Sequence, residues 1–143
     1  MAVADTNYRP VYVDIGSYGK DCDCTIFKRS TLWTSVQTNV LELSSETHLS
    51  ETEGPNVPYF FVGDEGFELN RIILRPFGGT NLSVKKRLYY NRLCRAQRYV
   101  ECAFGILSNK WRIFQRLLSV SPDFAVVIVK ANVLHNFVRK RWL

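Results

Sequence analysis

Strand-forming and helix-forming patterns follow one another along the first third of the chain. Val, Tyr and Ile dominate residues 1–15, which predicts extended structure, and Pro10 indicates a turn or a sheet edge. Residues 25–36 mix apolar and polar side chains and predict one or two short helices. Asp23 precedes this stretch, in a place where an aspartate is a normal N-cap.

The middle of the chain combines a polar segment with a short apolar one. Residues 42–58 contain four acids and no Lys or Arg, and we expect a surface loop within one domain. Residues 59–62 (Tyr-Phe-Phe-Val) favour a strand buried on both faces. After Asp64, apolar residues between 67 and 74 predict a short helix that ends before Pro76.

Helical patterns dominate the second half. Apolar residues recur every three or four positions over residues 83–108, which predicts a long helix with Ser83 as its N-cap. Gly105 costs this helix about 1 kcal/mol relative to alanine, unless another group must approach closely there. Ser121, Pro122 and Asp123 supply the cap, the first-turn proline and the first-turn acid of a single final helix.

Composition limits the class of protein. With 143 residues, of which 46% are hydrophobic and 22% charged, the chain is expected to form one globular domain. We see no secretory signal and no apolar run near the roughly 20 residues that a membrane helix needs. The four cysteines show no zinc-binding spacing, so reduced thiols are expected.

Charge is divided unequally along the chain. Residues 1–70 contain 4 Lys/Arg against 11 Asp/Glu, a net charge of −7, whereas residues 71–143 contain 15 against 2, a net charge of +13. The basic half should attract a polyanion. Glu101 is one of the two acids kept among these cations, which indicates either an ion pair or a metal ligand.

Two carboxylates are the main candidates for chemistry. Asp64 follows an apolar strand, at the edge where α/β sheets bind ligands, although a turn or N-cap aspartate is the alternative. Glu101 lies on the long helix, and an ion pair with Arg98, three residues earlier, is its alternative. An aspartate and a glutamate so placed can share divalent metal ions, and two such ions can cut a phosphodiester bond.

The long helix also interleaves basic and aromatic side chains. This favours contact with a DNA backbone, while an ordinary solvated helix face is the alternative. His135, in the final helix, favours a packed or hydrogen-bonded core role over catalysis. The residues expected to bind nucleic acid are Lys85, Lys86, Arg87, Arg95 and Arg98.

The segments GDEGFELNRIILRP (residues 63–76) and NRLCRAQRYVECAFGIL (residues 91–107) closely resemble the nuclease domain of PIF/Harbinger-type DDE transposases. The resemblance covers about residues 8–139 and implies an α/β, ribonuclease-H-like fold of the DDE and retroviral-integrase type, with a mixed sheet and flanking helices. Asp64 and Glu101 correspond to the second and third carboxylates of the catalytic triad. Asp23 matches a position grouped with the metal ligands in some members, with Asp14 and Asp21 as nearby alternatives. The implied cofactor is Mg²⁺ or Mn²⁺.

The family's first carboxylate stands on an opening strand, typically in an Asp-Gly-Thr-like segment that this sequence lacks. We therefore expect residues 1–143 to form an N-terminally truncated nuclease domain. Two functions remain open. One is a transposase-derived, metal-dependent DNA nuclease, active or inactive as this fragment. The other is a non-catalytic remnant that binds DNA or a protein through its basic half. The resemblance further implies a Myb-like or helix-turn-helix partner protein, no membrane, and a nuclear location, with the cytoplasm as an additional one.

Overall fold

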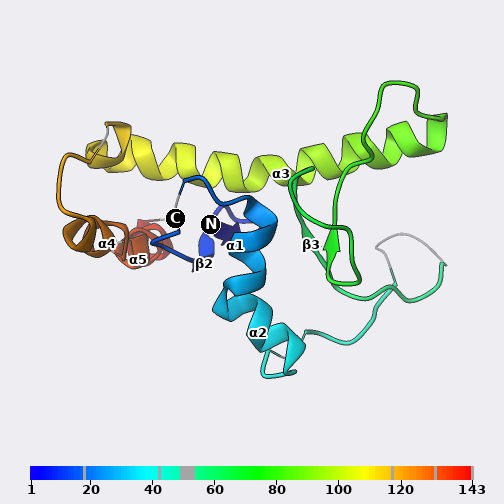
Figure 1. The fold of residues 1–143 in the computed structure, drawn as a ribbon, viewed down its shortest axis with the longest axis horizontal. Coiled ribbons are helices and arrows are strands. Elements are labelled where there is room, and N and C mark those ends of the chain that lie inside the picture. Colours follow the sequence, from blue (N-terminus) through cyan, green and yellow to red (C-terminus); the bar gives the residue numbers. More distant parts are fainter. Residues whose placement is uncertain (18, 42, 49–53, 117, 131, 143) are drawn as a thin grey trace. The chain divides into compact units, whose positions relative to one another are not determined.

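The computed structural model describes residues 1–17, 19–41, 43–48, 54–116, 118–130 and 132–142. The chain divides into two compact units, coloured along the sequence in Figure 1. Unit 1 comprises Met1–Asp21 and Gln97–Leu143, and unit 2 comprises Cys22–Ala96. Both contain helices and a small sheet, which makes this a mixed α/β protein.

Unit 1 begins with an antiparallel hairpin of β1 (Ala2–Ala4) and β2 (Pro10–Val13). The extended structure predicted for residues 1–15 is confirmed, and Pro10 opens β2. The final helix predicted after Ser121 is confirmed on both sides of residue 131, as α4 (Pro122–Lys130) and α5 (Asn132–Trp142). Residue 131 itself lies outside the described residues.

The interior of unit 1 contains a polar side chain. His135 on α5 is only 1% exposed, and Trp111 donates a hydrogen bond from Nε1 to Nδ1 of His135 at 3.2 Å. Trp111 immediately precedes the short 3₁₀ helix η1 (Arg112–Gln115). Ala103 is also buried there. The hydrogen-bonded core role predicted for His135 is therefore confirmed.

Unit 2 begins with two helices, α1 (Asp23–Arg29) and α2 (Thr31–Gln37), which confirms the prediction for residues 25–36. Ser30 separates them and caps α2, because its hydroxyl accepts a hydrogen bond from the backbone N–H of Trp33 at 3.2 Å. The N-cap of α1 is Cys22, so the alternative of Asp23 as the cap is wrong. Asp23 is the first helical residue instead, and its side chain is exposed.

The small sheet of unit 2 corrects two predictions. β3 (Phe61–Val62) pairs in parallel with β4 (Ile73–Leu74), so the short helix predicted after Asp64 is wrong. Asn70 is the cause, since its Oδ1 accepts the backbone N–H groups of Ile72 and Ile73 and turns the chain into β4. The strand predicted as buried on both faces is also wrong, because β3 is half-buried and Phe60 before it is exposed.

Residues 43–48 and 54–58 of the predicted polar loop carry one isolated antiparallel bridge, between Thr47 and Val57. Residues 42 and 49–53 of that loop lie outside the described residues.

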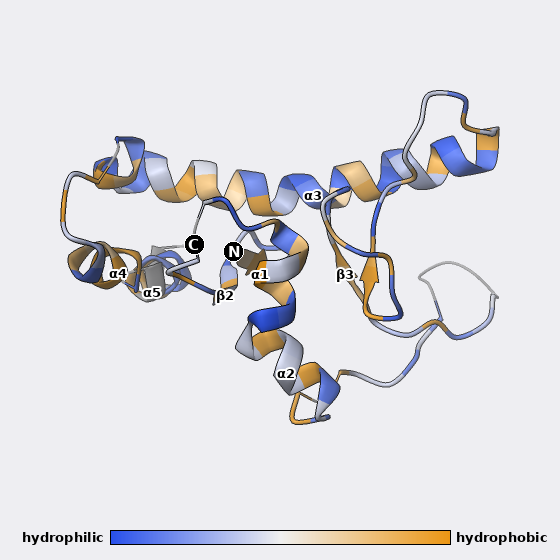
Figure 2. Cartoon of the chain, viewed as in Figure 1, coloured by the Kyte–Doolittle hydropathy of each residue, from blue (hydrophilic) through white to orange (hydrophobic). Residues whose placement is uncertain are grey.

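Helix α3 (Val84–Lys110) contains 27 residues and confirms the long helix predicted after Ser83. Ser83 accepts the backbone N–H of Arg87 at its carbonyl oxygen. Figure 2 shows apolar and polar positions interleaved along this helix. Leu93, Ala103 and Leu107 form its buried stripe. Within the described part of the chain, no helix is long and apolar enough to cross a membrane.

Candidate functional site

The candidate site in unit 2 begins with the turn that follows β3. Asp64 lies two residues after Val62, and its Oδ1 accepts the backbone N–H of Gly66 at 2.8 Å. The carbonyl oxygen of Asp64 also accepts the N–H of Phe67 at 3.2 Å. A side-chain acceptor two residues before its donor fixes an Asx-type turn. The Asp64 carboxylate is thus held by the backbone while remaining exposed to solvent.

Helix α1 docks against this turn through one aromatic pair and one ion pair. The rings of Phe27 and Phe67 meet edge to face, with centroids 5.9 Å apart. Lys28 Nζ lies 2.5 Å from Glu68 Oε2, and the hydrogen bond between them, followed by their opposite charges, raises the pKa of Lys28 and lowers the pKa of Glu68. Phe27 is 5% exposed, so the aromatic contact is the firmer of the two, whereas exposed ion pairs contribute little.

This docking brings Asp23 and Asp64 to the same place, on either side of Gly66. A Cβ atom on Gly66 would lie 3.0 Å from Asp64 Oδ1 and 3.6 Å from Asp23 Oδ2. The two carboxylate oxygens are therefore separated by no more than the sum of these two distances. A divalent ion bound by carboxylate oxygens has ligands at roughly 2.0–2.6 Å, so two oxygens on one ion lie at most about 5 Å apart. The absence of a side chain at Gly66 leaves the carboxylates room for such an arrangement.

The described residues provide no cation that neutralises this pair of acids. Across the described residues, neither Asp23 nor Asp64 forms an ion pair with a lysine or arginine. The same part of the chain contains no group of three or more His, Cys, Asp or Glu side chains that could hold a metal ion. Carboxylate oxygens are suitable ligands for Mg²⁺ or Mn²⁺. Two carboxylates alone, however, are only part of the ligand set that such an ion needs.

Glu101 belongs to unit 1, on an exposed face of α3. Within the described residues Glu101 forms no ion pair, so the alternative of a pair with Arg98 is not formed. Cys102 and Gly105 beside it are exposed, and only Ala103 of these small residues is buried. Of these three small residues, only Ala103 is therefore packed into a core.

The predicted nucleic-acid-binding residues are all exposed on α3. At about 100° per residue, Arg87, Arg95 and Arg98 fall within an arc of roughly 80°, opposite the buried stripe of the helix. Lys86 lies elsewhere, with Nζ 5.1 Å from the centre of the Phe77 ring. Lys85 lies in the first turn. The arginines, rather than the two lysines, share one continuous face.

Two other side chains in unit 2 have shifted pKa values. The hydrogen bond between Cys22 Sγ and Thr25 Oγ1, at 3.0 Å, lowers the pKa of the Cys22 thiol at the start of α1. A hydrogen bond with Cys94, and then the negative charges of Cys94 and Glu65, raise the pKa of Tyr90. Tyr90 therefore stays a neutral phenol at physiological pH.

Comparison with known proteins identifies the family of this chain. Residues 1–136 match the model of the DDE superfamily endonuclease family. The chain belongs to the DDE superfamily endonucleases. "Protein ALP1-like" of Arabidopsis thaliana is 27% identical over 147 aligned residues, which cover 96% of this chain and 34% of that protein. The chain thus spans about a third of the length of this relative. No solved structure matches the chain.

Membership of the DDE family confirms the resemblance inferred from residues 63–76 and 91–107. Sequence patterns missed Gly66, the residue that lies between the two aspartates. They also missed a basic hollow in unit 1, lined by Arg9, Arg139 and Lys140, among others. The only available signal for Gly66 was its spacing two residues after Asp64, which favours an Asx turn. Nothing in the sequence connects Arg9 with Arg139.

Proposed function

We propose that this chain is the nuclease part of a transposase-derived protein, that it adopts a ribonuclease-H-like fold, and that it cuts DNA with Mg²⁺ or Mn²⁺. Asp23, Asp64 and Glu101 would be the ligands. The observation that carries the proposal is the convergence of the Asp23 and Asp64 carboxylates beside Gly66, without a neutralising cation in the described residues. Two adjacent anions repel each other, and a divalent cation relieves this repulsion.

Each residue has a distinct task in this proposal. When bound, the metal ion supplies Lewis-acid activation of water or a 3′-hydroxyl and stabilises the leaving oxygen. Asp64 is oriented for this by the Gly66 N–H, so that its second oxygen is the one available to a ligand. Asp23 is positioned by the packing of α1 against the Asp64 turn. Glu101 completes the set by family correspondence.

DNA is the proposed substrate because the exposed arginines of α3 provide charge for the phosphate backbone. Phosphate contacts hold a strand without reading its sequence. Nuclear DNA and a Myb-like or helix-turn-helix partner protein, which would supply sequence recognition, belong to this proposal as well. They rest on the family resemblance alone.

Plasmid nicking in the presence of Mn²⁺ tests the proposal. Asp64→Ala and Glu101→Ala should each abolish nicking, and Asp23→Ala should reduce it. Glu65→Ala is the matched control, because it removes the same charge at an exposed neighbour whose side chain is not among the proposed ligands. Nicking that persists unchanged in both Asp64→Ala and Glu101→Ala would rule out the catalytic assignment.

A second candidate is a non-catalytic protein that binds DNA through α3. The observation in its favour is that Arg87, Arg95 and Arg98 share an exposed face, which needs no metal to attract a polyanion. Wild-type chain that binds duplex DNA in EDTA but nicks none with Mn²⁺ or Mg²⁺ would favour this candidate. Nicking lost in Asp64→Ala, but not in Glu65→Ala, would exclude it.

A further inference from the structure

Unit 1 contains a basic hollow that none of the three proposed metal ligands lines. Its volume is about 350 Å³, and one wall is the turn between β1 and β2. The other wall is the last part of α5. The lining residues are Thr6, Asn7, Tyr8, Arg9, Arg139 and Lys140.

The turn that forms the first wall is fixed at several points. Asp5 Oδ1 accepts the backbone N–H groups of Asn7 and Arg9, both at 2.9 Å. Asp5 Oδ2 accepts Nε of Arg9 at 2.8 Å. Tyr8 adopts a φ of 57°, which is uncommon for a bulky residue and requires support from its surroundings.

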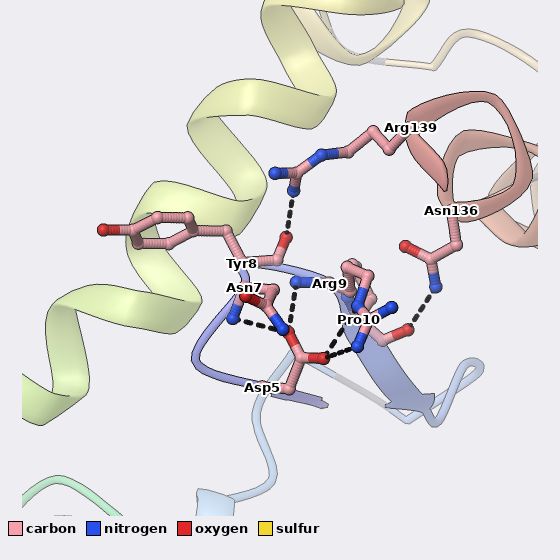
Figure 3. Close-up of polar contacts among 7 residues, drawn as sticks. All are labelled: Asp5, Asn7, Tyr8, Arg9, Pro10, Asn136 and Arg139. Atoms are coloured by element: carbon pink, nitrogen blue, oxygen red, sulfur yellow. Dashed lines mark hydrogen bonds and ion pairs between the residues drawn. The ribbon is translucent and has the colours of Figure 1, made fainter. Parts of the chain in front are cut away.

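That support reaches Tyr8 from α3 and α5. The ring of Tyr8 stacks on Tyr99, with centroids 5.1 Å apart. Arg139 reaches from α5 and donates from Nη1 to the Tyr8 carbonyl oxygen at 2.8 Å, and Asn136 donates to the carbonyl oxygen of Pro10 at 2.7 Å, as Figure 3 shows. The hollow is thus held open between two pinned elements rather than between mobile side chains.

The charges around the hollow favour an anion. Three cations line it, and Asp5 pairs with only one of them, Arg9, at 2.6 Å. A guanidinium has five N–H donors, and the bonds to Asp5 and Tyr8 leave donors on both arginines for a ligand. Among the described residues no acid pairs with Lys140, which supplies three more donors.

We propose that this hollow binds a phosphate group of a DNA strand. Guanidinium and ammonium groups converging from two elements match the tetrahedral oxygens of a phosphate, and the preset arginine geometry reduces the entropy lost on binding. The hydroxyl of Thr6 adds a neutral donor at the rim. The inference rests on the proposed function in one respect, since the strand held here is the substrate of the nuclease.

Lys140→Gln tests the hollow without disturbing the hydrogen bond from Arg139, and Lys130→Gln is the matched control. Lys130 is exposed at the end of α4 in the same unit and does not line the hollow. Binding of a duplex of about 20 base pairs is measured in EDTA over a range of salt concentrations. We expect Lys140→Gln to make the negative slope of log K against log salt shallower by about one and to weaken binding several-fold, with no change in slope for Lys130→Gln.

A second measurement uses inorganic phosphate and the backbone amide signals of Asn7, Tyr8 and Arg9 in NMR spectra of the full chain. Phosphate and duplex DNA should both shift these signals in the wild type, and less so in Lys140→Gln. Equal DNA binding by the two variants, or amides that phosphate does not move, would overturn the proposal. Shifts with phosphate but not with DNA would overturn the assignment to DNA and indicate a small phosphate compound. Because EDTA removes the metal, none of these outcomes depends on nicking, which Asp64→Ala tests separately.

Discussion

Asp5 and Asp64 occupy the same kind of turn in different units. Each accepts, at Oδ1, the backbone N–H of the residue two positions later, at 2.9 Å for Asp5 and 2.8 Å for Asp64. The second oxygen distinguishes them. The second oxygen of Asp5 is bound by Arg9, whereas that of Asp64 is not paired with any cation among the described residues. The carboxylate of Asp23 lies near the same Asp64 turn, at Gly66.

The contrast separates a structural aspartate from a candidate ligand. Partial burial would raise the pKa of Asp5, but hydrogen bonds from the Arg9 side chain and from the backbone of Arg9 and Asn7 outweigh it and hold the pKa below its ordinary value. Asp5 is therefore charged and satisfied. Asp64 is oriented by the same local geometry but lacks the arginine, so its charge is available to an external cation.

The largest expected effect comes from replacing each aspartate by asparagine. Asp64→Asn should reduce Mn²⁺-dependent nicking by at least about 100-fold, since a metal site contributes several kcal/mol, and should change the free energy of unfolding by less than about 0.5 kcal/mol. Asp5→Asn should lower the free energy of unfolding by about 1–2 kcal/mol, because the charge that binds Arg9 is lost. Nicking and urea unfolding measure the two effects.

The pH dependence of the unfolding free energy tests the role assigned to Asp5. Because its folded-state pKa is lowered, its stabilisation is fully present above the ordinary aspartate pKa of about 3.9 and is lost as pH falls through the folded-state value. Asp5→Asn should lack this acid-side loss, and Asp64→Asn should retain it. Identical acid unfolding of the wild type and Asp5→Asn would contradict the distinction between the two aspartates.

Gly66→Ala should weaken the candidate metal site without removing a ligand. The added Cβ would lie 3.0 Å from Asp64 Oδ1 and 3.6 Å from Asp23 Oδ2, so the Asp64 carboxylate must shift by a few tenths of an ångström. We expect Mn²⁺ affinity, measured by calorimetry, to fall about tenfold, or roughly 1.4 kcal/mol. Gly78→Ala is the control, since a Cβ there has no described atom within 4 Å. Equal affinities for the two variants would mean that the aspartates do not act together.

His135 extends the contrast, because its Nδ1 accepts a hydrogen bond from Trp111 while its buried Nε2 has no partner among the described atoms, and its protonation should respond to pH. Burial, and then the charges of Arg139 and Lys110, lower the pKa of His135. The resulting stabilisation is fully present above the ordinary value of about 6.5 and is lost as pH falls through the folded-state value. Between pH 7 and 5 we expect the wild type to lose about 1 kcal/mol more than His135→Gln, because protonated Nδ1 cannot accept from Trp111. Urea unfolding that changes equally in both would contradict this.

The smallest expected effect is that of replacing Gly105, which, unlike Gly66, has no neighbouring group close to it among the described residues. A Cβ on Gly105 would meet no described atom within 4 Å, so this glycine serves no close approach in the described structure. Gly105→Ala should raise the free energy of unfolding by about 0.5–1 kcal/mol through helix propensity and leave nicking unchanged. Thermal unfolding followed by circular dichroism measures it. Ala103→Gly, at a buried position of the same helix, should lower stability, and a stabilising Ala103→Gly would refute the propensity argument.

Sequence patterns predicted the helices and strands that depend on the residues within the segment itself. Strand-forming residues predicted extended structure where β1 and β2 lie, and apolar spacing with Ser83 predicted α3. The helix predicted after Asp64 was wrong, because the Asn70 side chain accepts two backbone N–H groups and turns an apolar run that also suits a helix into β4.

The candidate site could be predicted from the sequence only in part. The family resemblance indicated Asp23, together with Asp64 and Glu101, as a metal ligand. The position of Asp23 before a helical stretch, taken alone, favoured an N-cap. The meeting of Asp23 with Asp64 depends on the Phe27–Phe67 contact, which joins residues 40 positions apart and leaves no local signature. The basic hollow depends on Arg139 reaching a carbonyl group 131 residues earlier. Such contacts follow from tertiary packing, which periodicity and spacing do not encode.

The two sheets also affect how the protein is expected to behave at high concentration. In the described residues each sheet has two strands, so every strand presents one side of backbone donors and acceptors that no neighbouring strand uses. An edge of this kind can accept an extended segment from another molecule, which makes β1, β2, β3 and β4 the places where intermolecular pairing would start. Charged substitutions on these edges are therefore the natural means of keeping concentrated samples dispersed.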